Sequence, residues 1–146
     1  MNKNNLYLES IQTSLYIDIV LNILENHSQI SLNKIIFFSF LIKQQKNYLY
    51  SIYRSNNKNN VVLKAISLIS GSFEDYCNSI EFIVEAIHIL LMNNLILCKD
   101  GYLKKNKYVI EKKIINNKET AFIKRAIEES NYMTDKQFLK EVMNNV

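Results

Sequence analysis

Apolar side chains recur every three to four residues in the first part of the chain, which is the period of an amphipathic helix. Leu15, Ile19 and Ile23 are spaced by four, and polar turn-forming residues follow, so a first helix is predicted over Thr13–Asn26. The preceding segment, Met1–Glu9, reads as polar and lacks the apolar core of a signal peptide.

The run Ile35–Ile42 is apolar almost without interruption. Periodicity alone cannot assign such a run to a buried helix or to a buried strand. Polar flanks extend the segment from Ser31, an acceptable N-cap, to Gln45, and this length favours a second helix. A transmembrane span needs about 20 apolar residues, so the run is too short and no membrane crossing is expected.

The segment Tyr48–Arg54 is short and rich in aromatic residues, and its pattern assigns no secondary structure. Residues Ser55–Asn60 are polar and predict a loop. A third helix is predicted over Val61–Ser70, with Gly71 as its C-terminal stop.

A long helix is predicted from Ser72 to Asn93 or Asn94, with Ser72 as its N-cap and Asp75 three residues later in the manner of a capping box. One face of this helix is apolar, and glutamates lie off that face, where solvent reaches them. The apolar positions are Tyr76, Ile80, Ile83, Val84, Ile87, Leu90 and Leu91, and the glutamates are Glu74, Glu81 and Glu85.

A β-hairpin is predicted next. Leu95–Cys98 reads as a short strand, Asp100-Gly101 is a strong turn signal and Tyr102–Ile110 is the return strand. Helices followed by a helix, a strand, a tight turn and a strand are the order of a winged helix. The expected fold class is therefore mostly α (α+β), a helical domain with a winged-helix-like β-hairpin and the helix from Ser72 in the recognition position. An unrelated α+β domain that ends a helix in a hairpin remains the alternative.

Two further helices are predicted in the tail. One covers Lys118–Ser130, and the other begins at Thr134, where Gln137 completes a capping box. No internal repeat or low-complexity linker is visible. Residues 1–146 are therefore expected to form a single winged-helix-like domain with C-terminal helices.

Composition agrees with a small globular domain. Apolar residues make up 48% of the 146 residues and charged residues 22%, and the chain has no Pro and two Gly. The two cysteines, Cys77 and Cys98, are far apart and lack metal-ligand spacing. They are expected to be buried and reduced, as in a cytosolic protein, and the expected localisation is cytoplasmic.

Charge is distributed unevenly along the chain. Lys99–Arg125 holds nine basic and three acidic residues, a net charge of +6, whereas Val61–Cys98 carries −3. Lysines on a projecting hairpin suit contact with a phosphate backbone, and the candidate nucleic-acid-binding residues are Lys99, Lys104, Lys105, Lys107, Lys112 and Lys113. The predicted recognition helix is acidic and has no Arg, Lys or Gln to read base edges, so sequence-specific binding is not expected. A solvated, lysine-rich hairpin without a nucleic-acid partner is the alternative.

No catalytic or cofactor motif is recognised. Asp100 followed by Glu111-Lys112-Lys113 matches the Asp and Glu-x-Lys pattern with which restriction-type nucleases hold magnesium. Asp100, however, belongs to the Asp-Gly turn, where its ordinary role is turn formation. His27 and His88 lack ligand-spaced partners, and a surface Glu85–His88 pair explains the second. We therefore expect no enzymatic activity, no cofactor and no metal.

Three segments carry a family resemblance. They are L-x-K-I-I-F-F-S-F-L-I-K at Leu32–Lys43, F-x-x-Y-x-x-S-I-x-F-I-x-E-A-I-x-x-L-x-x-N at Phe73–Asn93, and L-I-x-x-x-x-G-Y-L at Leu95–Leu103. Together they resemble the middle component of bacterial three-component ABC-ATPase systems, the class that includes the small accessory subunit of Lamassu-type anti-phage defence complexes. The match covers Leu15–Ile110 and is carried by apolar spacing. Many such proteins contain Pro in these segments, and this chain departs from them in having none.

The resemblance implies partners rather than a reaction. It implies a non-catalytic accessory subunit that bridges an SMC-like or RecN-like ATPase and an effector, often a nuclease, in anti-phage or anti-plasmid defence. No catalytic residue carries over. Interfaces are rich in tyrosine, so Tyr48, Tyr50 and Tyr53 are the candidate partner-binding residues, the alternative being that these rings cover the second helix. A free-standing winged-helix DNA-binding regulator is the second functional hypothesis, and an enzyme with an unrecognised site is the third.

Overall fold

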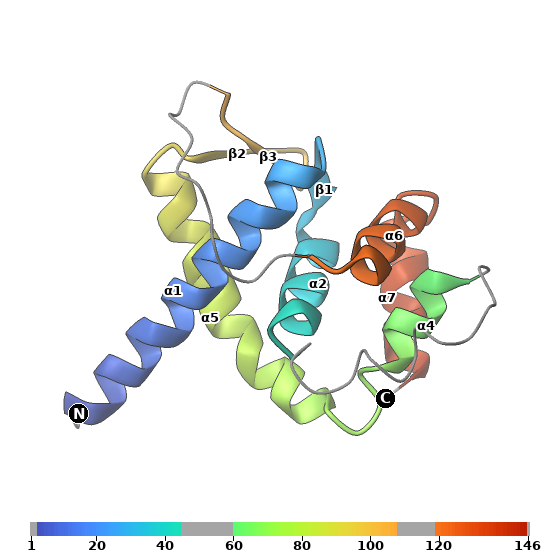
Figure 1. The fold of residues 1–146 in the computed structure, drawn as a ribbon, viewed down its shortest axis with the longest axis horizontal. Helices are drawn as coiled ribbons and strands as arrows, with labels where there is room; N and C mark the ends of the chain where they lie inside the picture. The colour runs from blue at the N-terminus through green and yellow to red at the C-terminus, as the bar shows by residue number, and fades with distance from the viewer. Residues whose placement is uncertain (1–2, 45–59, 108–118, 146) are drawn as a thin grey trace.

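The computed structural model describes residues 3–44, 60–107 and 119–145 of the chain (Figure 1). These ranges contain six helices and three short strands, and the connections within each range are short. In chain order the described elements are α1 (Lys3–Asn26), β1 (Ile30–Ser31), α2 (Leu32–Gln44), α4 (Val61–Ser67), α5 (Phe73–Met92), β2 (Ile96–Lys99), β3 (Tyr102–Lys105), α6 (Ala121–Ser130) and α7 (Asp135–Asn144).

The three strands form one small antiparallel sheet in the order β1-β3-β2. Strands β2 and β3 are joined by the predicted Asp100-Gly101 turn, in which both residues have positive φ, 52° and 77°. Positive φ at both central residues is the requirement of the tight turn that matches strand twist, and it explains the Asp-Gly pair. Strand β1 was not predicted, because two residues carry no periodic pattern and only the pairing of Ile30 with Leu103 reveals it.

The order α1-β1-α2-α5-β2-β3 is that of a winged helix, with α4 inserted before α5. The expected class, a mostly helical α+β fold with a winged-helix-like hairpin, is confirmed. Helices α1, α2 and α5 pack against one another, and α5 occupies the recognition position directly before the hairpin. In Figure 1 the sheet lies across the top of this group, while α4, α6 and α7 form a second group at the right.

Helix α2 packs against α1 and α5 on one side and against α6 and α7 on the other, so it joins the two groups (Figure 1). Every residue from Lys34 to Ile42 is buried, which confirms the helical reading of the apolar run. The Phe37 ring contacts Tyr76 of α5, at 5.9 Å between ring centroids, and Phe138 of α7, at 5.3 Å. A helix that is apolar all round is thus explained by neighbours on opposite sides of it.

Buried polar contacts hold the C-terminal helices against α2. The ammonium of Lys34 donates to the carbonyl oxygens of Ser130 (2.8 Å) and Met133 (2.7 Å) in the turn between α6 and α7. The Asp135 carboxylate accepts from the Ser31 hydroxyl at 2.6 Å and from the Asn33 amide at 3.1 Å. Burial lowers the pKa of Lys34, and the nearby Asp135 carboxylate opposes that effect.

A second polar contact joins α1 to the start of α6. The His27 imidazole lies 3.0 Å from a carboxylate oxygen of Glu119, and both side chains are buried. The Glu119 backbone N–H donates to the Asn22 side chain, and the other Glu119 carboxylate oxygen has no hydrogen-bond partner among the described residues. His27 is therefore part of the packing between helices.

The predicted helix ends agree with the structure at α7 and differ at three other places. Thr134 and Gln137 form the predicted capping box, in which each side chain accepts from the other residue's backbone N–H. Ser72 does not cap α5, because its hydroxyl donates to the carbonyls that precede it instead. Helix α4 ends at Ser67, and the chain then turns through Gly71. Helix α6 begins at Ala121 with Thr120 as N-cap, later than predicted.

Two larger differences concern α1 and β3. Helix α1 begins at Lys3, about three turns before the predicted start, because no Pro or Gly interrupts the segment and extending an existing helix is cheap. Strand β3 ends at Lys105, before Asn106 and Lys107 of the predicted return strand, and Tyr108–Ile110 lie outside the described residues. Lys105 pairs with Ile96, and β2 begins there, so no partner strand lies beyond.

Neither α1 nor any other helix in the described ranges is long and apolar enough to cross a membrane.

Candidate functional site

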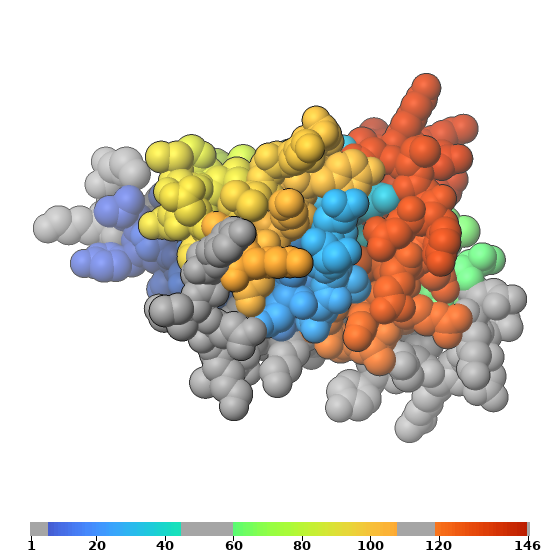
Figure 2. All heavy atoms as spheres, turned by 90° about the horizontal axis from the view of Figure 1, so that it is seen from above, coloured from blue at the N-terminus to red at the C-terminus, as the bar shows by residue number. Residues whose placement is uncertain are grey.

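The β2–β3 hairpin presents one buried and one exposed face. Strand alternation turns Ile96 and Leu103 toward the core, where both are buried. The opposite face is exposed and carries Leu97, Lys99, Tyr102 and Lys104, with Lys99 opposite Tyr102 and Lys104 opposite Leu97. Two ammonium groups next to an exposed aromatic ring on a projecting hairpin suit a phosphate backbone or an acidic protein surface. Figure 2 views the molecule from the side of the sheet and shows the hairpin in gold across this surface.

The candidate nucleic-acid-binding lysines differ in exposure and in pairing. Lys99, Lys104 and Lys107 are exposed. Lys105 points the other way and lies 3.1 Å from the Glu25 carboxylate of α1, so its charge is partly compensated within the chain. Lys112 and Lys113 lie outside the described residues. The structure thus leaves three of the four described lysines facing solvent on the hairpin.

Helix α5 is acidic on its exposed side. Glu74, Glu81 and Glu85 are all exposed, as predicted, and Asp75 joins them in the first turn. Val84 is exposed too, which corrects its assignment to the apolar face. Its side chain is 45% exposed. A helix with this surface repels phosphates and offers the carboxylates of Glu74, Asp75 and Glu81 to a basic protein surface. The Glu85 carboxylate accepts from the Thr13 hydroxyl of α1 at 2.8 Å.

The nuclease look-alike is not assembled by the described residues. Asp100 is in the hairpin turn with φ 52°, and Glu111 and the lysines after it lie outside the described ranges. Within residues 3–44, 60–107 and 119–145, no group of three or more His, Cys, Asp or Glu side chains is placed to hold a metal ion. His88 is exposed on α5.

The prediction that both cysteines are buried is wrong. Cys77 and Cys98 are free thiols, and both are exposed. Cys77 follows Tyr76, and one residue along a helix is enough to turn the side chain from the core to solvent. Cys98 lies on β2, an edge strand of the sheet, on which Ile96 is the buried residue.

An exposed apolar surface on α1 was missed because Met1–Glu9 was read as polar. Leu6, Tyr7, Leu8 and Ile11 are 53%, 70%, 60% and 56% exposed. This half of α1 projects beyond α5 (Figure 1, dark blue). A signal for it exists in the sequence, since Leu8 and Ile11 continue the spacing of Leu15 and Ile19 by three and four residues toward the start of the helix.

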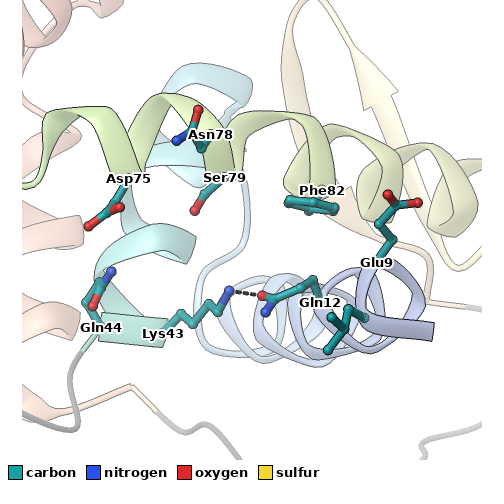
Figure 3. Close-up of a pocket in the computed structure, with 9 residues that line it drawn as sticks. Glu9, Gln12, Lys43, Gln44, Asp75, Asn78, Ser79 and Phe82 are labelled. Atoms are coloured by element: carbon teal, nitrogen blue, oxygen red, sulfur yellow. Dashed lines mark hydrogen bonds between the residues drawn. The ribbon is translucent and has the colours of Figure 1, made fainter. Parts of the chain in front are cut away.

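A groove adjoins this surface. It is bounded by α1, the end of α2 and the first half of α5, and its volume is about 470 Å³ (Figure 3). Leu8 and Phe82 supply apolar lining, and the polar lining comes from Glu9, Gln12, Lys43, Gln44, Asp75, Asn78 and Ser79.

Lys43 is the cation of this groove, and it is already engaged. It donates to the Gln12 side chain and lies over the Tyr16 ring, 4.7 Å from its centroid. Burial lowers the pKa of Lys43 and raises that of Tyr16. By contrast, no hydrogen bond or ion pair within the described part of the chain reaches the carboxylates of Glu9 and Asp75, so the groove is acidic in effect.

The candidate partner-binding residues Tyr48, Tyr50 and Tyr53 lie outside the described residues, as does nearly all of the predicted loop Ser55–Asn60. Their assignment to an interface stays a prediction.

No protein-family model, no curated protein and no solved structure matches this chain.

Proposed function

We propose that the chain is a non-catalytic accessory subunit of an SMC-like ABC-ATPase complex, which bridges the ATPase and an effector in bacterial anti-phage or anti-plasmid defence. A cytoplasmic location belongs to this proposal. The resemblance of Leu32–Lys43 and Phe73–Leu103 to middle components of three-component systems supplies the identity of the partner. The surface of the fold supplies the reason to expect a protein partner at all.

The acidic exposed side of α5 is the observation that carries the proposal. In a winged helix that reads DNA, the helix before the hairpin enters the major groove and needs side chains that donate to base edges and phosphates. Here that helix has no Lys or Arg between Phe73 and Met92, and its exposed side carries four carboxylates. A winged helix with this surface is suited to bind a protein.

The exposed apolar residues of α1 support the same conclusion. Four large apolar side chains, Leu6, Tyr7, Leu8 and Ile11, are more than half exposed on one projecting helix. A cluster of this kind on a small domain is typical of an interaction surface.

The alternative is a free-standing winged-helix DNA-binding regulator. The exposed lysines Lys99, Lys104 and Lys107 favour it, since the hairpin can follow a backbone without help from α5. The two hypotheses differ in their partner: the regulator binds an operator as a symmetric dimer, whereas the subunit binds an ATPase.

Affinity purification of the tagged chain from its own host tests the proposal. We expect a large coiled-coil ATPase to co-purify at a fixed ratio and its gene to lie beside the gene of this chain. The same chain purified alone is expected to cleave neither DNA nor RNA in magnesium. Absence of any ATPase from the purified material, together with tight binding to one DNA sequence, would establish the regulator instead.

A further inference from the structure

The projecting half of α1 and the groove beside it form one continuous surface. Leu8 belongs to both, since it is 60% exposed on α1 and also lines the groove. From Leu8 the surface runs along Ile11 on one side and toward Phe82 on the other. We infer that this surface, named here the α1 groove, docks a basic amphipathic helix of a partner protein.

The apolar part of the surface has the spacing of a helix-packing seam. Leu8, Ile11 and Leu15 repeat at three and four residues, and Tyr7 lies beside them. On the same helix Tyr16, Ile19 and Ile23 are completely buried in the core. The apolar stripe that packs in the core therefore continues toward the start of α1, where Leu8 and Ile11 are left uncovered. Such an uncovered stripe is matched by the apolar face of another helix.

The charges around the groove determine which charged residues the docked helix can carry beside its apolar face. Glu9 and Asp75 face the groove from opposite walls, and no partner within the described residues neutralises them. Lys43 is taken up by Gln12 and by the Tyr16 ring. Glu74 and Glu81 extend the acidic surface along α5. Lys or Arg at the edges of the docked helix complements this surface, whereas acidic residues there are repelled.

A second copy of the chain fits this surface less well. A standard interface takes about 800 Å² from each partner, and four partly exposed side chains on α1 supply well under that area. The groove must be covered as well, and a second copy of α1 brings Glu9 toward carboxylates of the same sign. A basic helix from another protein covers both parts without this repulsion.

The inference rests on the proposed function only in that the α1 groove would be the surface that binds the subunit's protein partner. The experiment does not require the ATPase. The probe is a display library of twenty-residue amphipathic helices with a fixed apolar face and random charged positions at its edges. The folded full-length chain selects binders from it. We expect selected peptides to be enriched in Lys and Arg at the edges.

Two variants and two controls locate the binding. Glu9→Lys with Asp75→Lys reverses the groove charge, and we expect the selected peptides to bind about tenfold more weakly or worse. Leu8→Ser with Ile11→Ser removes the apolar seam and is expected to abolish binding. All four positions are exposed, so melting temperatures should change little. Glu128→Lys on α6 and Tyr132→Ser in the turn after it are exposed and distant controls, and binding should survive both.

Three results would overturn the inference. The first is selection of peptides without a basic excess, or equal binding to the charge-reversed variant. The second is a chain dimer in sedimentation that Leu8→Ser with Ile11→Ser dissociates, which makes a second copy the occupant. The third is peptide binding that begins only after Tyr50→Ala with Tyr53→Ala, which makes the chain's own tyrosines the occupant. An ATPase that still co-purifies with the groove variants leaves the proposed function standing and removes this surface from it.

Discussion

Single buried polar groups fix how the two groups of helices meet. Lys34 places an ammonium among apolar side chains, where it is 3% exposed and hydrogen-bonded to two carbonyl oxygens. An ammonium buried without partners would be strongly unfavourable, so the geometry of the α6–α7 turn is specified by the need to satisfy it. The half-buried Asp135 carboxylate adds hydrogen bonds from Ser31 and Asn33 at the start of α2.

Tyr76 is the residue whose ionisation should be visible in stability. Its side chain is 8% exposed and contacts Phe37 and Phe40, and burial raises its pKa from 10 to about 12. Below pH 10 the hydroxyl is protonated in both the folded and the unfolded chain. Between pH 10 and about 12 the unfolded chain loses this proton first, so the free energy of unfolding falls as pH rises.

We therefore predict that Tyr76→Phe flattens the alkaline loss of stability. The difference from wild type should reach about 1–3 kcal/mol at the upper end of this range. Urea unfolding measured at a series of alkaline pH values checks it. Tyr132→Phe, at a position 92% exposed, is the matched control and should follow the wild-type profile. Parallel profiles for the wild type and the Tyr76 variant would contradict the prediction.

At the scale of elements, two helix starts with similar sequences differ in structure. Thr134 caps α7 through a complete capping box, whereas Ser72 stands before α5 and makes no cap. Both positions look like N-caps in the sequence, but only Thr134 has the extended backbone of a cap, with ψ 157°, whereas ψ at Ser72 is 21°. The pair therefore allows the contribution of the cap to be measured within one protein.

We predict that Thr134→Ala destabilises the fold by about 1 kcal/mol, because the Gln137 backbone N–H loses its acceptor. Ser72→Ala should cost less, since its hydroxyl only supplements carbonyls of the preceding turn. Urea midpoints of the two variants give the comparison. Equal losses, or a larger loss at Ser72, would show that the capping box does not stabilise α7.

The hairpin is the element from which any DNA contact should come. Lys99 and Lys104 are exposed on its outer face, while Lys105 is paired with Glu25. We predict weak, sequence-independent binding whose dependence on salt falls by about 0.9 in log–log slope for each phosphate-contacting lysine removed. Lys99→Ala and Lys104→Ala should each lower the slope, and Lys105→Ala should lower it less. Fluorescence anisotropy with duplexes of unrelated sequence measures these slopes, and a strong preference for one duplex would refute the prediction.

For the whole molecule, α2 is the element that the winged-helix part and the C-terminal helices share. Its buried residues belong to one continuous core with residues of α1, α5, α6 and α7. A core that is continuous through a central helix favours unfolding in a single cooperative step.

We predict that Phe37→Ala destabilises both groups of helices together, by about 3–5 kcal/mol. Phe37 is completely buried between Tyr76 and Phe138, so its loss leaves a cavity that touches both sides. Tyrosine fluorescence and far-ultraviolet circular dichroism should report coincident transitions in the wild type and in the variant. Leu139→Ala, at a position 38% exposed on α7, is the milder control. Two separated transitions would show that the groups unfold independently.

The sequence by itself determined the features that depend on near neighbours along the chain. The period of apolar residues located α5 and the second half of α1, the length of the apolar run with its polar flanks located α2, and the Asp100-Gly101 pair located the hairpin turn. The Thr134 capping box was readable for the same reason, because a helix start is decided by side chains three residues apart. From these elements the winged-helix order followed.

Only the tertiary structure decided the features that depend on residues far apart. The end of β3 at Lys105 depends on where β2 begins, and the compensation of Lys105 depends on Glu25, eighty residues earlier. The exposure of Cys77 and Cys98 depends on how far the core extends, which a local pattern does not record. The α1 groove combines residues of three helices, and none of these residues is distinctive alone. The groove exists because the packing of the three helices leaves these side chains uncovered, and a local sequence pattern does not record that packing.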